Sequence, residues 1–209
     1  MKKLIPLLLL FLSCKPGKHT KSFEGKVIYN NIYKSNSAAF TDKQLIEIMG
    51  PKQEYYIKDG NYKSVLNGSG IEWQLYINRE NKIYTKIKGS SEILKNDAVE
   101  NTDEVLKTEF NKQVTQVLGY TCDEVILTCK SGLQKYYFNS QLPVDPSLFK
   151  KHKLGNWNVY VSLAKALPLK MIIDTKDFRF ESTATEIKEQ KLESSFFELK
   201  NDPGIKIIP

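Results

Sequence analysis

The fold is decided by one short stretch of sequence, Glu54-Tyr55-Tyr56-Ile57-Lys58-Asp59-Gly60-Asn61-Tyr62-Lys63-Ser64-Val65-Leu66. Two runs rich in aromatic and β-branched residues flank Asp59-Gly60. This dipeptide favours a type I′ turn, because both central residues of that turn need a positive φ. The stretch therefore predicts a β-hairpin with strands over 54–58 and 61–66.

Further strands are predicted on both sides of this hairpin. A long strand is expected over 23–34, where apolar residues fall on both parities, and two more over 71–77 and 82–88, where they alternate with polar residues. Later in the chain, strands are expected over 110–118, 121–129, 133–139, 168–175 and 178–190. No connection between these strands is long enough for a crossover helix, so the sheet is expected to be antiparallel throughout.

Helical signals occur in three places. Thr41-Asp42-Lys43-Gln44 is a capping box, and Asp145-Pro146 combines an N-cap residue with a proline at the first helical position. The segment 157–164 has helical spacing of its apolar residues, although alternation within it also fits a strand. The expected class is therefore mainly β, of the α+β type, with about three short helices.

Composition excludes several classes of protein. The 209 residues include 31 Lys+Arg and 24 Asp+Glu, a formal net charge of +7, and 41% are hydrophobic, which is too apolar for a disordered chain. No stretch reaches the roughly 18 apolar residues of a membrane span. Removal of the first 13 residues, argued next, leaves 196, the size of one domain.

The N-terminus has the pattern of an export signal. Met1-Lys2-Lys3 is followed by a nine-residue apolar run and then by Phe11-Leu12-Ser13-Cys14, which resembles a bacterial lipobox. We expect residues 1–13 to be a lipoprotein signal peptide, Cys14 to carry the lipid anchor, and 14–22 to form the lipidated Cys and a flexible tether. A conventionally cleaved secretory signal and a buried N-terminal helix are the alternatives.

Few side chains are available for catalysis or metal binding. The chain has two His and three Cys, and the common nucleophile, zinc and phosphate-loop motifs are absent. His19 lies in the tether, and His152 lies among three lysines whose positive field should lower its pKa. We therefore expect no enzyme activity, no catalytic residue, no metal and no cofactor.

The two remaining cysteines, Cys122 and Cys129, lie seven positions apart in one predicted strand. That separation is about 23 Å, against a limit of roughly 7 Å for a disulfide. We expect both thiols to be free, one in the core and the other half-exposed, because odd spacing places them on opposite faces.

Lysines interleaved with aromatic residues, as in 82–86 and 134–138, have two interpretations. They resemble a platform for single-stranded nucleic acid, but they also fit the solvated face of a sheet. Because arginine is scarce and the leader exports the chain, we expect no nucleic acid partner. Separately, we expect the domain to be a monomer. Contact of these lysines with lipid phosphates is a weaker alternative.

Five segments carry a family resemblance: Lys58-Asp59-Gly60-Asn61-Tyr62-Lys63, Leu118-Gly119-Tyr120-Thr121-Cys122-Asp123, Leu142-Pro143-Val144-Asp145-Pro146-Ser147, Leu167-Pro168-Leu169-Lys170-Met171 and Ser194-Ser195-Phe196-Phe197-Glu198-Leu199. Over 23–209 the chain resembles Bacteroidetes-type envelope lipoproteins, which are similar to the periplasmic lipoprotein-carrier (LolA/LolB-like) superfamily. The resemblance implies one domain, a curved antiparallel half-barrel with short helices on its concave face. It assigns no catalytic residue. The expected location comes from the residues after Cys14: Lys15 stands where inner-membrane lipoproteins commonly have Asp, and no acidic cluster follows, which resembles an outer-membrane lipoprotein that faces the periplasm.

Two functions from different classes follow. The first is a binding module whose concave face receives a hydrophobic ligand, namely a lipid, an acyl chain or a lipoprotein. Its candidate ligand-binding residues share strand parities: Trp73, Leu75, Ile77, Leu169, Met171 and Ile173. The second is a structural or interaction protein of the cell envelope, in which these side chains pack beneath the protein's own helices. An open cleft of roughly 300 Å³ or more favours the first, and a filled interior favours the second.

Overall fold

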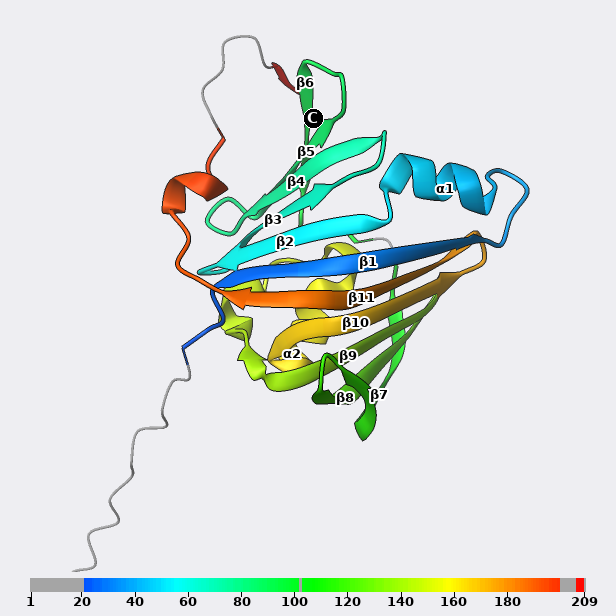
Figure 1. Cartoon of the computed structure of the whole chain (residues 1–209), viewed down its shortest axis with the longest axis vertical. Helices are drawn as coiled ribbons and strands as arrows, with labels where there is room; N and C mark the ends of the chain where they lie inside the picture. Colours follow the sequence, from blue (N-terminus) through cyan, green and yellow to red (C-terminus); the bar gives the residue numbers. More distant parts are fainter. Residues whose placement is uncertain (1–20, 102, 200–205, 209) are drawn as a thin grey trace, which may run out of the picture.

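The structure, a computed structural model, describes residues 21–101, 103–199 and 206–208. They form one open sheet of twelve strands in the order β12-β6-β5-β4-β3-β2-β1-β11-β10-β9-β8-β7. The sheet curves into a half-barrel-like shape around the yellow helical segment (Figure 1). The prediction of a mainly β fold built on one curved sheet is confirmed.

Ten of the twelve strands correspond to predicted segments, and the strands over 92–97 and 206–208 have no predicted counterpart. The twelve strands are β1 (Gly25–Ser35), β2 (Lys52–Lys58), β3 (Asn61–Leu66), β4 (Ile71–Ile77), β5 (Lys82–Ile87), β6 (Glu92–Asp97), β7 (Val105–Val117), β8 (Tyr120–Cys129), β9 (Gly132–Pro143), β10 (Ala166–Thr175), β11 (Phe178–Glu189) and β12 (Lys206–Ile208). In the predicted hairpin, Asp59 (φ 47°) and Gly60 (φ 78°) both have positive φ, as a type I′ turn requires.

Two meanders make up the sheet. Strands β1 to β6 pair in sequence order, as do β7 to β11, and the two runs join where β11 pairs with β1. The chain's first and last long strands are therefore neighbours near the middle of the sheet, and β7 forms one outer edge (Figure 1).

One strand departs from the expected antiparallel pattern. The three-residue strand β12 pairs with β6 in parallel. The connection from Glu189 to Lys206 exceeds the dozen or so residues that a parallel connection needs, so the chain can return in the direction of β6. The antiparallel prediction holds for β1 to β11.

The helical predictions need a correction, because the described residues contain two α-helices rather than about three. The capping box begins α1 (Asp42–Met49), and the third signal forms α2 (Trp157–Ala164). Asp145-Pro146 instead starts a single 3₁₀ turn, η1 (Pro146–Phe149). Helix α1 has no buried residue and packs beside β1, away from the concave face.

The concave face is covered by the segment between β9 and β10. This segment contains η1, a second 3₁₀ turn, η2 (Leu154–Asn156), and α2, which packs on β8, β9 and β10. The main hydrophobic core includes residues from α2 and from the inner faces of the strands. No helix of the described residues is long and apolar enough to cross a membrane.

A second, smaller core lies under the C-terminal segment. Leu75, Ile77, Tyr84 and Ile93 of β4, β5 and β6 cluster with Phe197, which lies in the 3₁₀ turn η3 (Ser194–Phe197). Tyr76 belongs to the main core on the inner face, and Leu75 is the residue before it in β4. Successive side chains of a strand point to opposite faces, so Leu75, its partner Lys63 and this cluster lie on the outer face of the sheet. The C-terminal segment therefore covers the outer face as α2 covers the inner one.

Candidate binding cleft

The inner face of β2 to β5 is not completely filled. A cleft of about 280 Å³ remains between these strands and the η2–α2 segment. It is lined by Gln53, Tyr55, Tyr62, Ser64, Gln74, Ile83, His152, Leu154, Gly155 and Trp157. The volume is close to the 300 Å³ at which binding cavities for small molecules begin.

Strand register places the lining residues of the sheet side by side. Tyr55 pairs with Ser64, and Ser64 pairs with Gln74, so these three form one row across β2, β3 and β4. Tyr62 and Ile83 lie in the next inward-facing row, where both pair with Tyr76. Directly opposed residues on one face are close neighbours, so the row presents a continuous floor.

Aromatic rings form the apolar part of the cleft. The Tyr62 ring stacks against those of Tyr55, with centroids 5.2 Å apart, and Tyr76, at 5.1 Å. The His152 ring stacks on Tyr62 at 5.7 Å, and Trp157 lies 6.4 Å from His152. Interlocked rings are stiff, so they preorganise the walls of the cleft.

His152 is the most unusual of these residues. Its side chain is 2% exposed, and its Nε2 lies 2.8 Å from the Tyr62 hydroxyl. Burial lowers the pKa of His152 to about 4, so the imidazole is neutral at physiological pH. The predicted direction of this pKa shift agrees, but its cause is burial among aromatic rings rather than the field of neighbouring lysines.

The remaining wall comes from the loop before α2. Gly155 (φ 63°) and Asn156 (φ 60°) adopt the left-handed conformation in succession immediately before α2. Glycine adopts this conformation freely, and asparagine is among the residues most enriched in it, so both fit the turn. Asn156 is 2% exposed and is held by hydrogen bonds with Asn101 (2.7 Å) and the Cys129 Sγ (3.4 Å).

Three buried polar atoms of cleft-lining residues have no hydrogen-bond partner from another described residue. These are the Tyr55 hydroxyl, the Trp157 Nε1 and the His152 Nδ1. Burial also raises the pKa of Tyr55 well above its usual value, so the hydroxyl keeps its proton. A buried group left unpaired costs about 1–3 kcal/mol, and such groups in a native protein call for an explanation.

The floor of the cleft also carries two amides. Gln53 donates its Nε2 to the Ser64 hydroxyl (2.8 Å), and Gln74 donates its Nε2 to the hydroxyl of Thr85 (3.3 Å). In the described part of the chain, both Oε1 atoms remain without a hydrogen bond. None of the lining residues carries a formal charge at neutral pH, since His152 is neutral.

The structure does not bring the six candidate ligand-binding residues together. Trp73, Leu75 and Ile77 belong to the outer cluster beneath the C-terminal segment. Leu169, Met171 and Ile173 pack in the inner core. The two triplets therefore lie on opposite faces of the sheet, and none of the six lines the cleft.

Other predicted sites have clear positions. Cys122 and Cys129 are both free and both buried, so the expectation that one is half-exposed is wrong. Burial raises the pKa of each thiol, to about 11 for Cys129. Cys14, the predicted anchor, lies outside the described residues.

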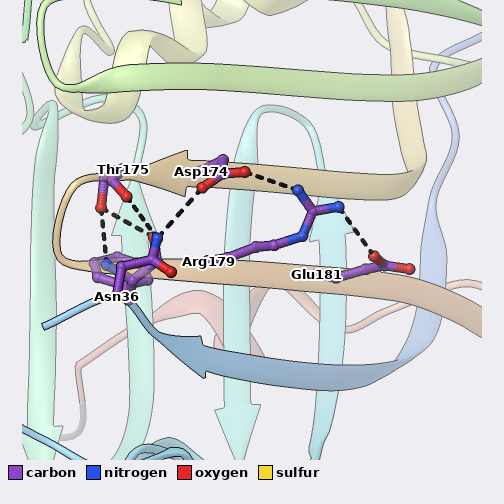
Figure 2. A network of polar contacts seen from close by, with 6 residues as sticks. Asn36, Asp174, Thr175, Arg179 and Glu181 are labelled. Carbon is purple, nitrogen blue, oxygen red and sulfur yellow. Dashed lines mark hydrogen bonds and ion pairs between the residues drawn. The ribbon is translucent and has the colours of Figure 1, made fainter.

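The most connected charged network lies at the β10–β11 turn (Figure 2). Arg179 pairs with Asp174 (2.8 Å) and Glu181 (3.8 Å). Asn36, just after β1, donates its Nδ2 to the Thr175 carbonyl (2.8 Å). These groups satisfy one another and fasten the turn to the end of β1, so the network is structural.

Among the described residues, no three His, Cys, Asp or Glu side chains are placed to hold a metal.

Comparisons with known proteins find similarity at the level of structure alone. No family model and no curated protein matches the sequence. The solved structure of PNGF-II is similar, with a TM-score of 0.49 and 15% identity over 90% of this chain and 31% of that chain. The chain thus spans less than a third of the length of PNGF-II, and the likeness carries no argument about function.

Proposed function

We propose that this chain is an outer-membrane-anchored periplasmic lipoprotein whose domain is a non-catalytic binding module. Its site is the concave cleft, and its ligand is hydrophobic in part: a lipid, an acyl chain or a lipoprotein. The observation that supports this proposal is the open cleft of about 280 Å³ on the inner face of the sheet, walled by Tyr55, Tyr62 and Trp157. Preformed concave sites with aromatic walls and few polar groups are the usual form of ligand pockets.

The polar groups at the cleft favour binding over catalysis. The Ser64 hydroxyl accepts a hydrogen bond from the Gln53 amide, and among the described residues it donates to no base. His152 is neutral and is engaged with Tyr62 through Nε2, and Nδ1 has no partner from another described residue. A nucleophile needs an adjacent base to be activated, and this arrangement supplies none among the described residues.

Edge strand β7 favours a second function, that of a structural or interaction protein of the envelope. Leu106, Phe110 and Val114 are exposed on β7, which among the described strands pairs with β8 alone. An exposed edge with apolar side chains is a site where another chain can pair. In this alternative the cleft has no small-molecule ligand.

Native mass spectrometry of the full chain after incubation with a diacyl phospholipid tests the binding proposal. We expect a 1:1 adduct for the wild type and its loss in Leu154→Trp, which adds bulk at the rim of the cleft. The matched control is Leu163→Trp on α2, because the two leucines are 42% and 40% exposed. An adduct that survives Leu154→Trp, or no adduct at all, would count against the cleft as a lipid site.

Cys14 gives a separate prediction about the anchor. Cys14→Ser should abolish incorporation of labelled palmitate and leave an unprocessed precursor, because the thiol is the expected site of acylation. Several acyl chains together give effectively permanent membrane binding, since each buried CH₂ contributes about 0.8 kcal/mol. Membrane fractionation with palmitate labelling measures this. A wild-type chain that is unlabelled and cleaved at another bond would contradict the anchor.

A further inference from the structure

The chemistry of the cleft lining restricts the ligand further. None of the lining residues is charged at neutral pH, so a carboxylate, phosphate or ammonium entering the cleft would find no countercharge there. Transfer of an ion from water to such a site is strongly unfavourable. The part of the ligand that occupies the cleft is therefore uncharged.

An acyl chain can fill the apolar part of this cleft, but it leaves the polar groups of the lining unpaired. Gln53 and Gln74 present amide oxygens without hydrogen bonds among the described residues, and the Ser64 hydroxyl lies between them on the floor of the cleft. An acyl chain in contact with these groups would exclude water from them and supply nothing in return. A ligand whose hydroxyl groups both donate and accept hydrogen bonds would satisfy these polar groups.

The arrangement of rings and amides suggests the shape of that ligand. Aromatic rings of Tyr55, Tyr62 and Trp157 supply flat apolar surface, and the amides lie on the floor formed by β2 and β4. A sugar ring has the complementary structure, since its C–H groups form apolar faces and its hydroxyls point outward at the edge. We propose that the cleft binds an uncharged saccharide unit, an inference that rests on the proposed function of the cleft as a binding site.

Two sources can supply such a unit: a free oligosaccharide or the headgroup of a neutral glycolipid. Both present the same chemistry to the cleft. The glycolipid keeps its acyl chains outside the cleft, which agrees with the partly hydrophobic ligand of the proposed function.

The two tryptophans of the chain make a direct test possible. Trp157 lines the cleft, and Trp73 lies in the outer cluster on the other face of the sheet. In the full chain carrying Trp73→Phe, Trp157 is the sole reporter. Titration with maltose should change its emission, and titration with glucuronate, an anionic sugar acid, should give at least tenfold weaker binding.

Amide substitutions locate the binding. In the Trp73→Phe background, Gln74→Ala should weaken maltose binding about tenfold, because a hydrogen bond to the sugar is lost. Gln116→Ala is the matched control, since Gln116 is an exposed amide on β7 outside the cleft. Circular dichroism establishes that both variants are folded, and a Gln74→Ala variant that does not fold is replaced by Gln53→Ala.

The outcomes separate this inference from the proposed function. No emission change with maltose, equal binding of glucuronate, or an unchanged affinity in the folded amide variant overturns the saccharide proposal. A phospholipid adduct that depends on the cleft would still support the binding module in that case, whereas failure of both experiments overturns both.

Comparison of maltose with dodecyl maltoside below its micellar concentration distinguishes the sources. Tighter binding of the glycoside indicates a glycolipid headgroup, equal binding indicates a free saccharide, and either result supports the proposal.

Discussion

Replacement of Tyr160 by alanine is expected to lower the free energy of unfolding by about 3–5 kcal/mol. Tyr160 is fully buried on α2, its ring stacks on Tyr136 at 4.2 Å, and its hydroxyl donates to the Ala166 carbonyl at 2.9 Å. The substitution removes the ring that holds α2 against the sheet and leaves a cavity in the main core. Denaturant unfolding followed by circular dichroism measures the change.

Two variants control this result. Leu163→Ala lies on the same helix at 40% exposure, so it should change the free energy of unfolding by less than about 0.5 kcal/mol. Tyr160→Phe keeps the ring and removes only the hydroxyl, so it should cost about 1 kcal/mol. A loss below about 1 kcal/mol in Tyr160→Ala would show that α2 does not hold the core as described.

Stability should fall as the pH is lowered from about 6.5 to 4.5, and His152 should cause most of that loss. Its pKa is about 4 in the folded protein and about 6.5 when unfolded, so in this range the unfolded state binds a proton that the folded state excludes. The stabilisation is complete above pH 6.5 and decreases as the pH falls through this window. Each pH unit costs about 1.4 kcal/mol, which gives a loss of about 2–3 kcal/mol by pH 4.5.

The variant His152→Gln isolates this effect, because it removes the titrating group and keeps a polar side chain. Its free energy of unfolding should be lower at pH 7 but nearly constant between pH 6.5 and 4.5. Hydrogen bonds hold the pKa values of carboxylates such as Glu24 and Glu54 below their ordinary value of 4.5, so these groups lose most of their contribution as the pH falls below 4.5. An equal loss of stability in His152→Gln over the window would show that other groups are responsible.

The sequence predicts individual strands better than it predicts their faces. Asp59-Gly60 fixes one hairpin, because its turn chemistry is local, whereas β6 escapes prediction because Ile93 is the one residue of that strand in the buried class. Parity correctly places Trp73, Leu75 and Ile77 on one face of β4. Which face is inner depends on register across the sheet and on the position of Phe197, and both are long-range features.

The cleft escapes prediction for a related reason. Gln53, Ser64 and Gln74 are polar residues at inward-facing positions, so the alternation of apolar residues that marks the buried face of a strand does not identify them. The sequence neighbours of His152 are lysines, which argue against a site. Its neighbours in space are rings from β3, β4 and α2, so the local charge pattern gives no indication of its surroundings.

The pairing of β1 with β11 has a consequence for how the chain reaches its folded state. Val27 and Ile187 are partners in the register although 160 positions separate them in the sequence. Contacts of such long range form slowly, because the entropy of closing the loop opposes them until many other contacts are in place. A chain that is synthesised or exported N-terminus first therefore presents an unpaired β1 edge until residue 189 has emerged. During that interval the edge is open to pairing with other chains, which is a route to misassembly.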